Sequence, residues 1–268
     1  MAGRGDVSLR HLGWSGLRIE RPAGPVLFID PPAATMADDR PALVLLTHGH
    51  PEHVAGTVAR LATAVDGQHT VIGASAVVCA HLARRYRGVN ATFKPLRPGD
   101  RLVLGDGIEV AVFGWRHLPL LPSGIGPALQ HVRRLLSRPT LCARIIAAGI
   151  RGPRAGPMLG FRLGIGGQRL LVYGEGLHRR SAAAELAAQC RGSEDGTLLV
   201  AVEPEDQEFL PALIAASGLR HALLYEPHAH WRDAFGMPRA DLALLATALA
   251  ARGIEAEVLT VRTSVDRT

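Results

Sequence analysis

The stretch Thr47-His48-Gly49-His50-Pro51-Glu52-His53 places three imidazoles and one carboxylate between positions 48 and 53. Neutral histidine is the commonest metal ligand in proteins, and a neighbouring carboxylate suits a divalent ion such as zinc, manganese or iron. The stretch therefore predicts a metal site. The alternative is a histidine-rich loop that binds no ion, because short histidine motifs are reliable only when the structural context agrees.

The residues on either side of this stretch predict a turn between a strand and a helix. Residues 42–46 form a short apolar run of strand length, and Pro51 is well placed to begin a helix. His48 and His50 then leave an extended backbone in the same direction. Glu52 and His53 leave the first helical turn toward a second point in space.

Bulk composition narrows the class of protein. The chain has 268 residues and is 47% apolar, which is ample for a core, and we expect one domain over 1–268. A formal charge of +6 raises nucleic acid or an anionic membrane as partners. Aromatic residues make up 4% and no basic stripe contains them, so no nucleic acid partner is expected. Lys94 is the sole lysine, so the charge also agrees with a general preference for arginine.

The cysteines and the N-terminus predict a cytoplasmic protein. Cys79, Cys142 and Cys190 are far apart and form no Cys-x-x-Cys pair, so neither a disulfide framework nor a thiolate zinc site is indicated. Residues 1–12 lack the apolar core of a signal peptide, and no uninterrupted apolar run reaches membrane-spanning length.

The periodicity of apolar residues predicts a chain of mixed strands and helices, with one departure. An antiparallel meander is expected over 7–30, and further strands at 70–73, 92–114, 160–165, 169–173, 197–202, 221–225 and 255–261. Helices are expected at 54–65, 75–86, 182–188, 207–216 and 239–252. Residues 118–159 break this pattern and read as an insertion, with an amphipathic helix over 127–136 and an apolar piece over 141–150.

The order of these features resembles the metallo-β-lactamase fold superfamily over nearly the whole chain. The pieces that carry the resemblance are His11-Leu12-Gly13-Trp14-Ser15-Gly16, Phe28-Ile29-Asp30-Pro31, the histidine turn, Leu96-Arg97-Pro98-Gly99-Asp100 and Leu171-Val172-Tyr173-Gly174-Glu175-Gly176. The first two and the last are most similar to the branch of ascorbate-6-phosphate lactonase and N-acyl-phosphatidylethanolamine phospholipase D. The resemblance implies an α/β fold, a four-layer αββα sandwich, with one or two metal ions at one edge.

The resemblance also implies a set of ligands. The family motif His-x-His-x-Asp-His matches His48, His50, Glu52 and His53, with glutamate in place of aspartate. By the family pattern, His48 and His50 hold a first ion, and Glu52 and His53 hold a second. Glutamate reaches about 1.5 Å further than aspartate, so the second ion must shift or be lost.

Ligands from later segments complete the implied site. His117 is the expected third ligand of the first ion, and Glu175 stands where the family has a bridging aspartate. The last ligand is His228 or His230 in Glu226-Pro227-His228-Ala229-His230-Trp231, and His230 is narrowly preferred because of the tryptophan that follows it. The two glutamates suggest a centre resized for manganese or iron, although zinc is the commonest ion in such sites.

The remaining expectations concern roles around the metal. Asp30 is expected to be a buried carboxylate that hydrogen-bonds the histidine turn, or else a simple turn cap. Glu52 is expected to orient the attacking water and shuttle its proton, and His178 is expected to contact substrate. The implied activity is that of a hydrolase that uses a metal-bound hydroxide on an ester, phosphodiester or lactone.

Substrate choice and partners are expected to depend on the insertion. Its apolar residues alternate with arginines and could cover the site, bind an anionic or lipid-like small molecule, touch a membrane surface or form a homodimer contact. The insertion's arginines are Arg133, Arg134, Arg138, Arg144, Arg151 and Arg154. A different class of function is a degenerate scaffold for binding or regulation, in which Glu52 and Glu175 record loss of an ion.

Overall fold

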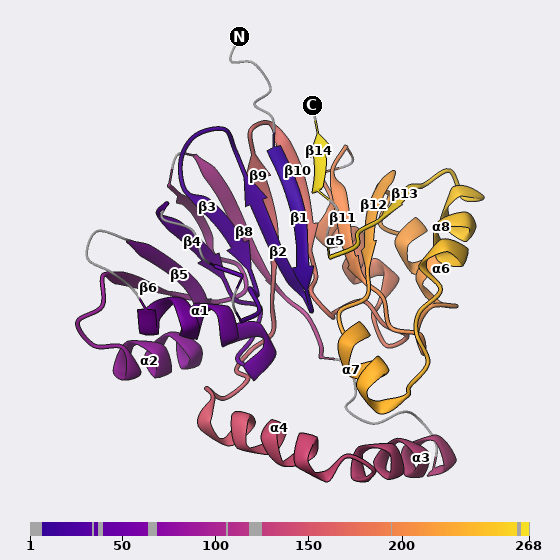
Figure 1. The fold of residues 1–268 in the computed structure, drawn as a ribbon. Helices are drawn as coiled ribbons and strands as arrows, with labels where there is room; N and C mark the ends of the chain where they lie inside the picture. Colours follow the sequence, from indigo (N-terminus) through magenta and orange to yellow (C-terminus); the bar gives the residue numbers. More distant parts are fainter. Residues whose placement is uncertain are drawn as a thin grey trace.

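Two β-sheets stacked face to face form the centre of the molecule (Figure 1). A computed structural model describes residues 7–33, 35–36, 40–63, 69–105, 107–117, 125–193, 195–261 and 264–267. In the order of its neighbours, the first sheet consists of β14 (Ser264–Arg267), β1 (Val7–Gly13), β2 (Gly16–Glu20), β3 (Val26–Ile29), β4 (Ala42–Leu45), β5 (Thr70–Ser75) and β6 (Ala91–Leu96). The second consists of β13 (Glu255–Val258), β12 (His221–Tyr225), β11 (Thr197–Ala201), β10 (Gln168–Val172), β9 (Leu159–Ile165), β8 (Ile108–Gly114) and β7 (Arg101–Leu104).

Each sheet buries one face against the other sheet, and helices cover part of the opposite face. Leu43 and Leu45 of β4 belong to the core between the sheets, whereas Val44 packs beneath α1 (Pro51–Thr63) and α2 (Ala76–Arg85). This alternation follows from the two-residue repeat of a strand, and it explains why every residue of β4 is buried. The outer face of the second sheet packs on α5 (Ala183–Cys190), α6 (Leu210–Ala215) and α8 (Leu242–Ala250). The expected four-layer αββα sandwich is confirmed.

The predicted elements agree with the structure apart from the extent of the last strand, but helix α7 (Ala229–Phe235) and strand β14 were not predicted. The meander over 7–30 is the antiparallel set β1, β2 and β3, and the strand region expected over 92–114 is divided into β6, β7 and β8. The strand expected at 255–261 ends at Val258. An additional strand, β14, then pairs antiparallel with β1 in the other sheet, which the sequence pattern did not predict.

The insertion forms two helices that lie across one end of the sandwich. Residues 118–124 lie outside the described residues, α3 (Ile125–Leu136) contains the predicted helix, and α4 (Pro139–Arg151) contains the apolar piece over 141–150. Figure 1 shows both helices outside the layers, at the end where α7 (Ala229–Phe235) also lies. Within the described ranges, none of the helices is both long and apolar enough to cross a membrane.

Strand direction brings distant segments to this same end. Strands β3 to β6 are parallel to one another, and so are β10 to β13. The carboxyl ends of parallel strands meet at one edge of a sheet, which is where ligand sites are built in α/β folds. Loops that follow β3, β4, β8, β10, β11 and β12 can therefore meet there.

Candidate metal centre

Side chains from several strand ends converge beside the histidine turn. The turn joins β4 to α1, His117 follows β8, Glu175 follows β10 and His228 follows β12. The turn itself is pressed against the chain that returns from the insertion, since the Gly49 amide donates to the Ala155 carbonyl at 2.9 Å. A Cβ at position 49 would lie 2.3 Å from the Arg154 carbonyl oxygen, so only glycine fits.

Within the described residues, two groups of ligand atoms are close enough to share an ion. The first comprises His48, His50 and His117, and the second comprises His48, His53 and Glu175. In each group the ligand atoms lie within 4.8 Å of one another, and His48 belongs to both. Ligand atoms around a tetrahedral zinc ion lie about 3.4 Å apart, given zinc–nitrogen bonds of about 2.1 Å. The structure thus brings together the three ligands expected for the first ion.

A second layer of hydrogen bonds fixes the direction of three imidazoles. Thr47 Oγ1 lies 3.0 Å from His48 Nδ1. Asp30 Oδ2 lies 2.8 Å from His53 Nδ1, and Glu203 Oε1 lies 2.5 Å from His228 Nδ1. Carboxylates that hold one ring nitrogen while the other faces an ion are typical of metal-binding histidines.

The opposite ring nitrogens face the centre of the cluster. His48 Nε2 lies 3.0 Å from His50 Nδ1. His53 Nε2 and His228 Nε2 lie 3.3 Å and 3.4 Å from Glu175 Oε1. His53 Nε2 is buried, and among the described residues it has no partner with hydrogen-bond geometry. A buried polar atom without a partner costs free energy unless an ion or a hydrogen bond satisfies it. The donor set therefore fits a divalent metal.

Asp30 has the place that the sequence analysis gave it. Its carboxylate accepts from the Thr47 amide at 2.8 Å and from Thr47 Oγ1 at 2.5 Å, in addition to its contact with His53. Its backbone has a φ of 45°, a left-handed conformation that aspartate tolerates better than most residues. The strained residue therefore aims a buried carboxylate at the histidine turn.

The electrostatics of the centre divide its groups into neutral and charged ones. Burial, together with the neighbouring imidazoles, holds the pKa of His48 far below its usual value, so it is neutral and able to bind metal. Burial opposes charge on His53 as well, but the Asp30 and Glu175 carboxylates outweigh it and raise the pKa of His53. Burial also opposes charge on His228, but the Glu175 and Glu203 carboxylates outweigh it and raise the pKa of His228 to about 9. Burial of Glu175 opposes the charge on its carboxylate. The charges of His228 and His53 outweigh this effect and hold the pKa of Glu175 well below its usual range.

The structure favours His228 over His230 as the histidine of this segment. His228 contacts both Glu175 and Glu203. His230 is exposed, and its ring packs on Trp14 with a centroid separation of 6.2 Å. The narrow preference for His230 is therefore not supported, because α7 begins at Ala229 and turns the next side chain away from the centre.

Glu52 and His178 make contacts other than those expected. Glu52 Oε1 lies 3.8 Å from His50 Nδ1 on the solvent side, and Glu52 belongs to neither group of ligand atoms. His178 is buried, and its Nε2 donates to the Arg116 carbonyl at 2.9 Å while its Nδ1 accepts from the Arg180 amide at 3.1 Å. Both ring nitrogens are thus used on backbone, so His178 fixes the loop next to His117.

Three residues at the centre were missed from the sequence. Glu203 orients His228, Thr47 contacts His48, and Ser15 Oγ donates to Glu175 Oε1 at 2.9 Å. One signal could have identified Glu203: it follows a buried strand, as Asp30 does, at the edge where the other ligands gather. Ser15 lies in the quoted motif over 11–16, but nothing in its spacing specifies Glu175 as a partner.

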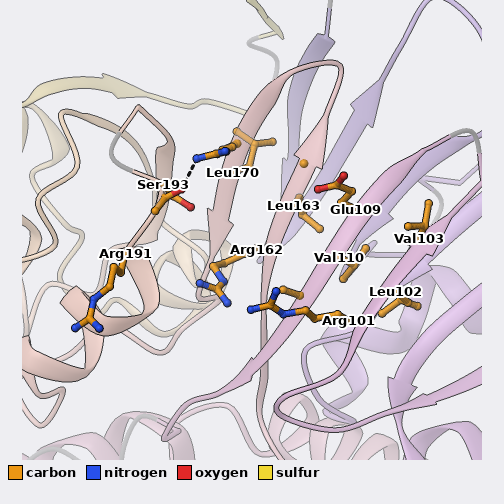
Figure 2. A pocket seen from close by; sticks show the side chains of 14 residues that line it. Arg101, Leu102, Val103, Glu109, Val110, Arg162, Leu163, Leu170, Arg191 and Ser193 are labelled. Carbon is orange, nitrogen blue, oxygen red and sulfur yellow. Dashed lines mark hydrogen bonds between the residues drawn. The ribbon is translucent and has the colours of Figure 1, made fainter.

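A separate hollow lies on the outer face of the second sheet (Figure 2). Its volume is about 460 Å³, and its lining includes Arg101, Arg162, Arg169 and Arg191 with Glu109 as an acidic neighbour. Arg101, Ala111 and Arg162 are paired across β7, β8 and β9, so the small alanine leaves a gap between two long basic side chains. We call this hollow the arginine groove. None of the residues in the two groups of metal-ligand atoms lines it.

Comparisons with known proteins identify the fold. No protein-family model and no curated protein sequence matches the chain. Among solved structures, Igni18, a metallo hydrolase from the archaeon Ignicoccus hospitalis, matches with a TM-score of 0.67 and 14% identity, over 98% of this chain and 99% of that one. The metallo-β-lactamase fold protein YhfI from Bacillus subtilis matches with a TM-score of 0.64 and 10% identity, over 98% of this chain and 100% of that one. A diphosphatase of the PhnP family matches with a TM-score of 0.56 and 11% identity, over 98% of each chain. The chain therefore has the metallo-β-lactamase fold.

Proposed function

We propose that this protein is a metal-dependent hydrolase whose ions are held by His48, His50, His53, His117, Glu175 and His228. The observation that carries the proposal is the direction of the imidazoles. Thr47, Asp30 and Glu203 hold the Nδ1 atoms of three histidines, and the Nε2 atoms of those histidines face a shared centre. Two ligand groups that share His48 support a binuclear site.

The residues around the centre have different roles in the proposed hydrolysis. A bound divalent ion would supply Lewis acidity toward an ester or phosphoryl oxygen and would acidify water near neutral pH. Burial keeps His48 in its neutral, ligating form. Asp30 and Glu203 keep the rings of His53 and His228 in place. Glu52, partly exposed beside His50, is a carboxylate at the solvent side that can accept a proton from an entering water.

We further propose an ester, phosphodiester or lactone as the substrate class, with zinc as the first ion to test and manganese or iron next. The imidazole-rich donor set favours zinc, and the glutamates tolerate harder ions. The metallo hydrolase and the diphosphatase among the structural neighbours are consistent with hydrolysis. The resemblance to the lactonase and phospholipase D branch gives the range of substrates to screen.

A metal analysis followed by a substrate screen tests this proposal. Protein purified without chelator is analysed by plasma emission spectrometry and then assayed with bis-p-nitrophenyl phosphate, simple lactones and phospholipids. We expect about two equivalents of metal and turnover of one class. His117→Ala should abolish turnover, whereas His221→Ala, at a solvent-facing histidine paired with Glu255, should leave it unchanged. Inertness of the metal-loaded protein toward all three classes would overturn the proposal.

A second candidate function is binding or regulation on a scaffold that holds no ion. One observation favours it: Glu175 Oε1 lies within 3.4 Å of Ser15 Oγ, His53 Nε2 and His228 Nε2, so a carboxylate already meets both imidazoles. The two histidines with raised pKa would then balance Glu175 and Glu203 as cations. An absence of metal in protein purified without chelator would favour this function over hydrolysis.

A further inference from the structure

We propose that the insertion helices, defined as α3 and α4, dock this protein on a membrane surface of anionic lipids. The proposal concerns binding and does not depend on turnover. It follows from where the charge of the chain lies, which apolar side chains are exposed, and how the helices are attached to the rest of the molecule.

The insertion carries the whole formal charge of the protein. Residues 118–159 contain six arginines and no lysine, aspartate or glutamate, and the formal charge of the chain is +6. The rest of the chain is therefore neutral overall. Arg133 of α3, Arg144 and Arg151 of α4, and Arg138 between the two helices are exposed. Basic residues near an anionic leaflet each contribute to binding, and here no acidic residue of the segment offsets them.

Large apolar side chains are exposed on the same helices. Ile125, Leu129, Val132 and Leu136 of α3 are spaced by four, three and four residues, which places them in one stripe along the helix. Their exposed fractions reach 82% at Ile125, and on α4 Ile150 is 80% exposed. Ile146, one turn before Ile150, is exposed as well. A basic helix with an unpartnered apolar stripe is typical of segments that lie in a membrane interface.

The helices are attached at the candidate metal centre. The chain leaving α4 runs over the histidine turn, where Gly49 donates to Ala155 at 2.9 Å. Pro153 is buried, and the end of α4 borders a small cavity of about 150 Å³ whose other walls include Pro51 and Val54 of α1. Docking through α3 and α4 would therefore bring the edge that carries the centre toward the lipid surface (Figure 1).

Charge favours lipid over a second copy as the occupant. In a two-fold symmetric dimer through these helices, the same patch of both copies would meet. Two segments of six arginines each would then face one another with no acidic residue from either segment between them. An anionic membrane supplies the opposite charge and accepts the apolar stripe at the same time.

The arginine groove is the rival basic surface, and its shape argues against it. It is concave, and Glu109 lies among its arginines (Figure 2). A membrane is met by side chains that protrude, as those of α3 and α4 do. The groove therefore provides the matched control for charge, because Arg101 and Arg191 are exposed and neither is hydrogen-bonded to a carboxylate in the described residues.

Vesicle flotation tests the proposal. Wild-type protein is mixed with vesicles of phosphatidylcholine alone or with about 30 mol% phosphatidylglycerol, and the bound fraction is measured at low and high salt. The charge variant is Arg133→Gln with Arg144→Gln, and the apolar variant is Leu129→Ser with Ile150→Ser. The control is Arg101→Gln with Arg191→Gln. Circular dichroism and the sedimentation coefficient of each protein without vesicles are recorded in parallel.

We expect the wild type to float with the anionic vesicles, weakly with phosphatidylcholine alone, and less at high salt. The charge and apolar variants should each bind roughly tenfold or more weakly, and the control variant should bind as the wild type does. Equal binding to both vesicle types, no binding, or loss in the control variant alone would overturn the proposal. So would a wild-type dimer without vesicles that the apolar variant dissociates, because a second copy would then cover the stripe.

Discussion

At the scale of single residues, the two ring nitrogens of a histidine determine whether it can serve the candidate metal centre. His53 and His228 each give one nitrogen to a carboxylate and turn the other toward Glu175. His178 gives both nitrogens to backbone. Burial alone does not separate these roles, since His53 and His178 are both buried. The hydrogen-bond partners do.

The pair His228 and His230 provides the sharpest residue-scale test. His228→Ala removes the imidazole that lies between Glu175 and Glu203, so we expect loss of about one equivalent of metal and of most activity. His230→Ala removes an exposed ring stacked edge-on with Trp14 and should leave metal content unchanged. Plasma emission spectrometry measures the metal content of both variants. Loss of metal in His230→Ala alone would show that His230, and not His228, is the ligand.

Glu203 provides a second residue-scale test, because it orients a ligand without being one. Glu203→Gln keeps the shape but removes the charge beside His228 and Arg232. We expect metal affinity to fall roughly 10- to 100-fold, as measured by competition with a chromophoric chelator. Glu208→Gln is the matched control, since Glu208 is exposed a few residues away. Equal affinity in the two variants would contradict the orienting role.

How far the sequence predicts this centre depends on whether a residue lies next to a recognisable strand end. His48, His50, His53, His117, Glu175 and Asp30 do, and the structure brings them together. The choice between His228 and His230 depends on where α7 starts, and no capping signal in the sequence marks that residue. Glu52 is one helical residue before His53, yet the helix directs its longer side chain to the solvent side of His50.

At the scale of elements, α1 is seated directly on the segment that carries Asp30. The Gly56 amide donates to the Pro31 carbonyl at 2.8 Å. A Cβ at position 56 would lie 2.5 Å from the carbonyl oxygens of both Pro31 and Pro32. The close approach sets the distance between His53 on α1 and Asp30 after β3. Gly56 is therefore needed for close packing. Replacing it with alanine, which usually stabilises a helix, is expected to destabilise the fold here.

Two alanine substitutions test this packing. Gly56→Ala should destabilise the fold by about 1–3 kcal/mol, because backbone atoms that cannot move aside meet the new methyl group. Gly149→Ala in α4 should be neutral or stabilising by up to about 1 kcal/mol, because a Cβ there meets nothing within 4 Å. Urea unfolding curves measure both. A stabilising Gly56→Ala would mean that α1 does not rest on the Asp30 segment.

Elements whose apolar pattern is set by two buried faces were the most predictable ones. Strands β3, β4 and β11 are buried throughout, and all their residues are apolar except Thr197 at the start of β11. β14 was missed because Ser264-Val265-Asp266-Arg267 contains one apolar residue, and its backbone pairing with β1 supplies what its composition does not. Likewise, the sequence predicted two apolar pieces in the insertion but not that both would form helices outside the layers of the sandwich.

At the scale of the whole molecule, the centre makes stability depend on pH in the absence of metal. Burial works against charge on His228, but Glu175 and Glu203 raise its pKa from 6.5 to about 9, and Asp30 and Glu175 also raise that of His53. Between pH 6.5 and about 9, His228 therefore binds more protons in the folded state than in the unfolded state. The resulting stability is fully present below pH 6.5 and is lost as the pH rises through 9.

His48 and His50, whose pKa values are lowered, contribute the opposite dependence near pH 6, so the test belongs above about pH 7.5, where both are neutral in the folded and the unfolded state. Chelator-treated protein should unfold at lower urea concentration at pH 9 than at about pH 7.5, with a slope of up to about 1.4 kcal/mol per pH unit for one proton. In His228→Ala the slope should be smaller, because one of the groups with raised pKa is gone. Metal affinity should change in the opposite direction over the same interval, since the ion must displace these protons. Metal-free stability that is flat or rises between about pH 7.5 and 9 would show that the buried carboxylates are not balanced by imidazolium, and the ion would then be needed to hold the folded centre together.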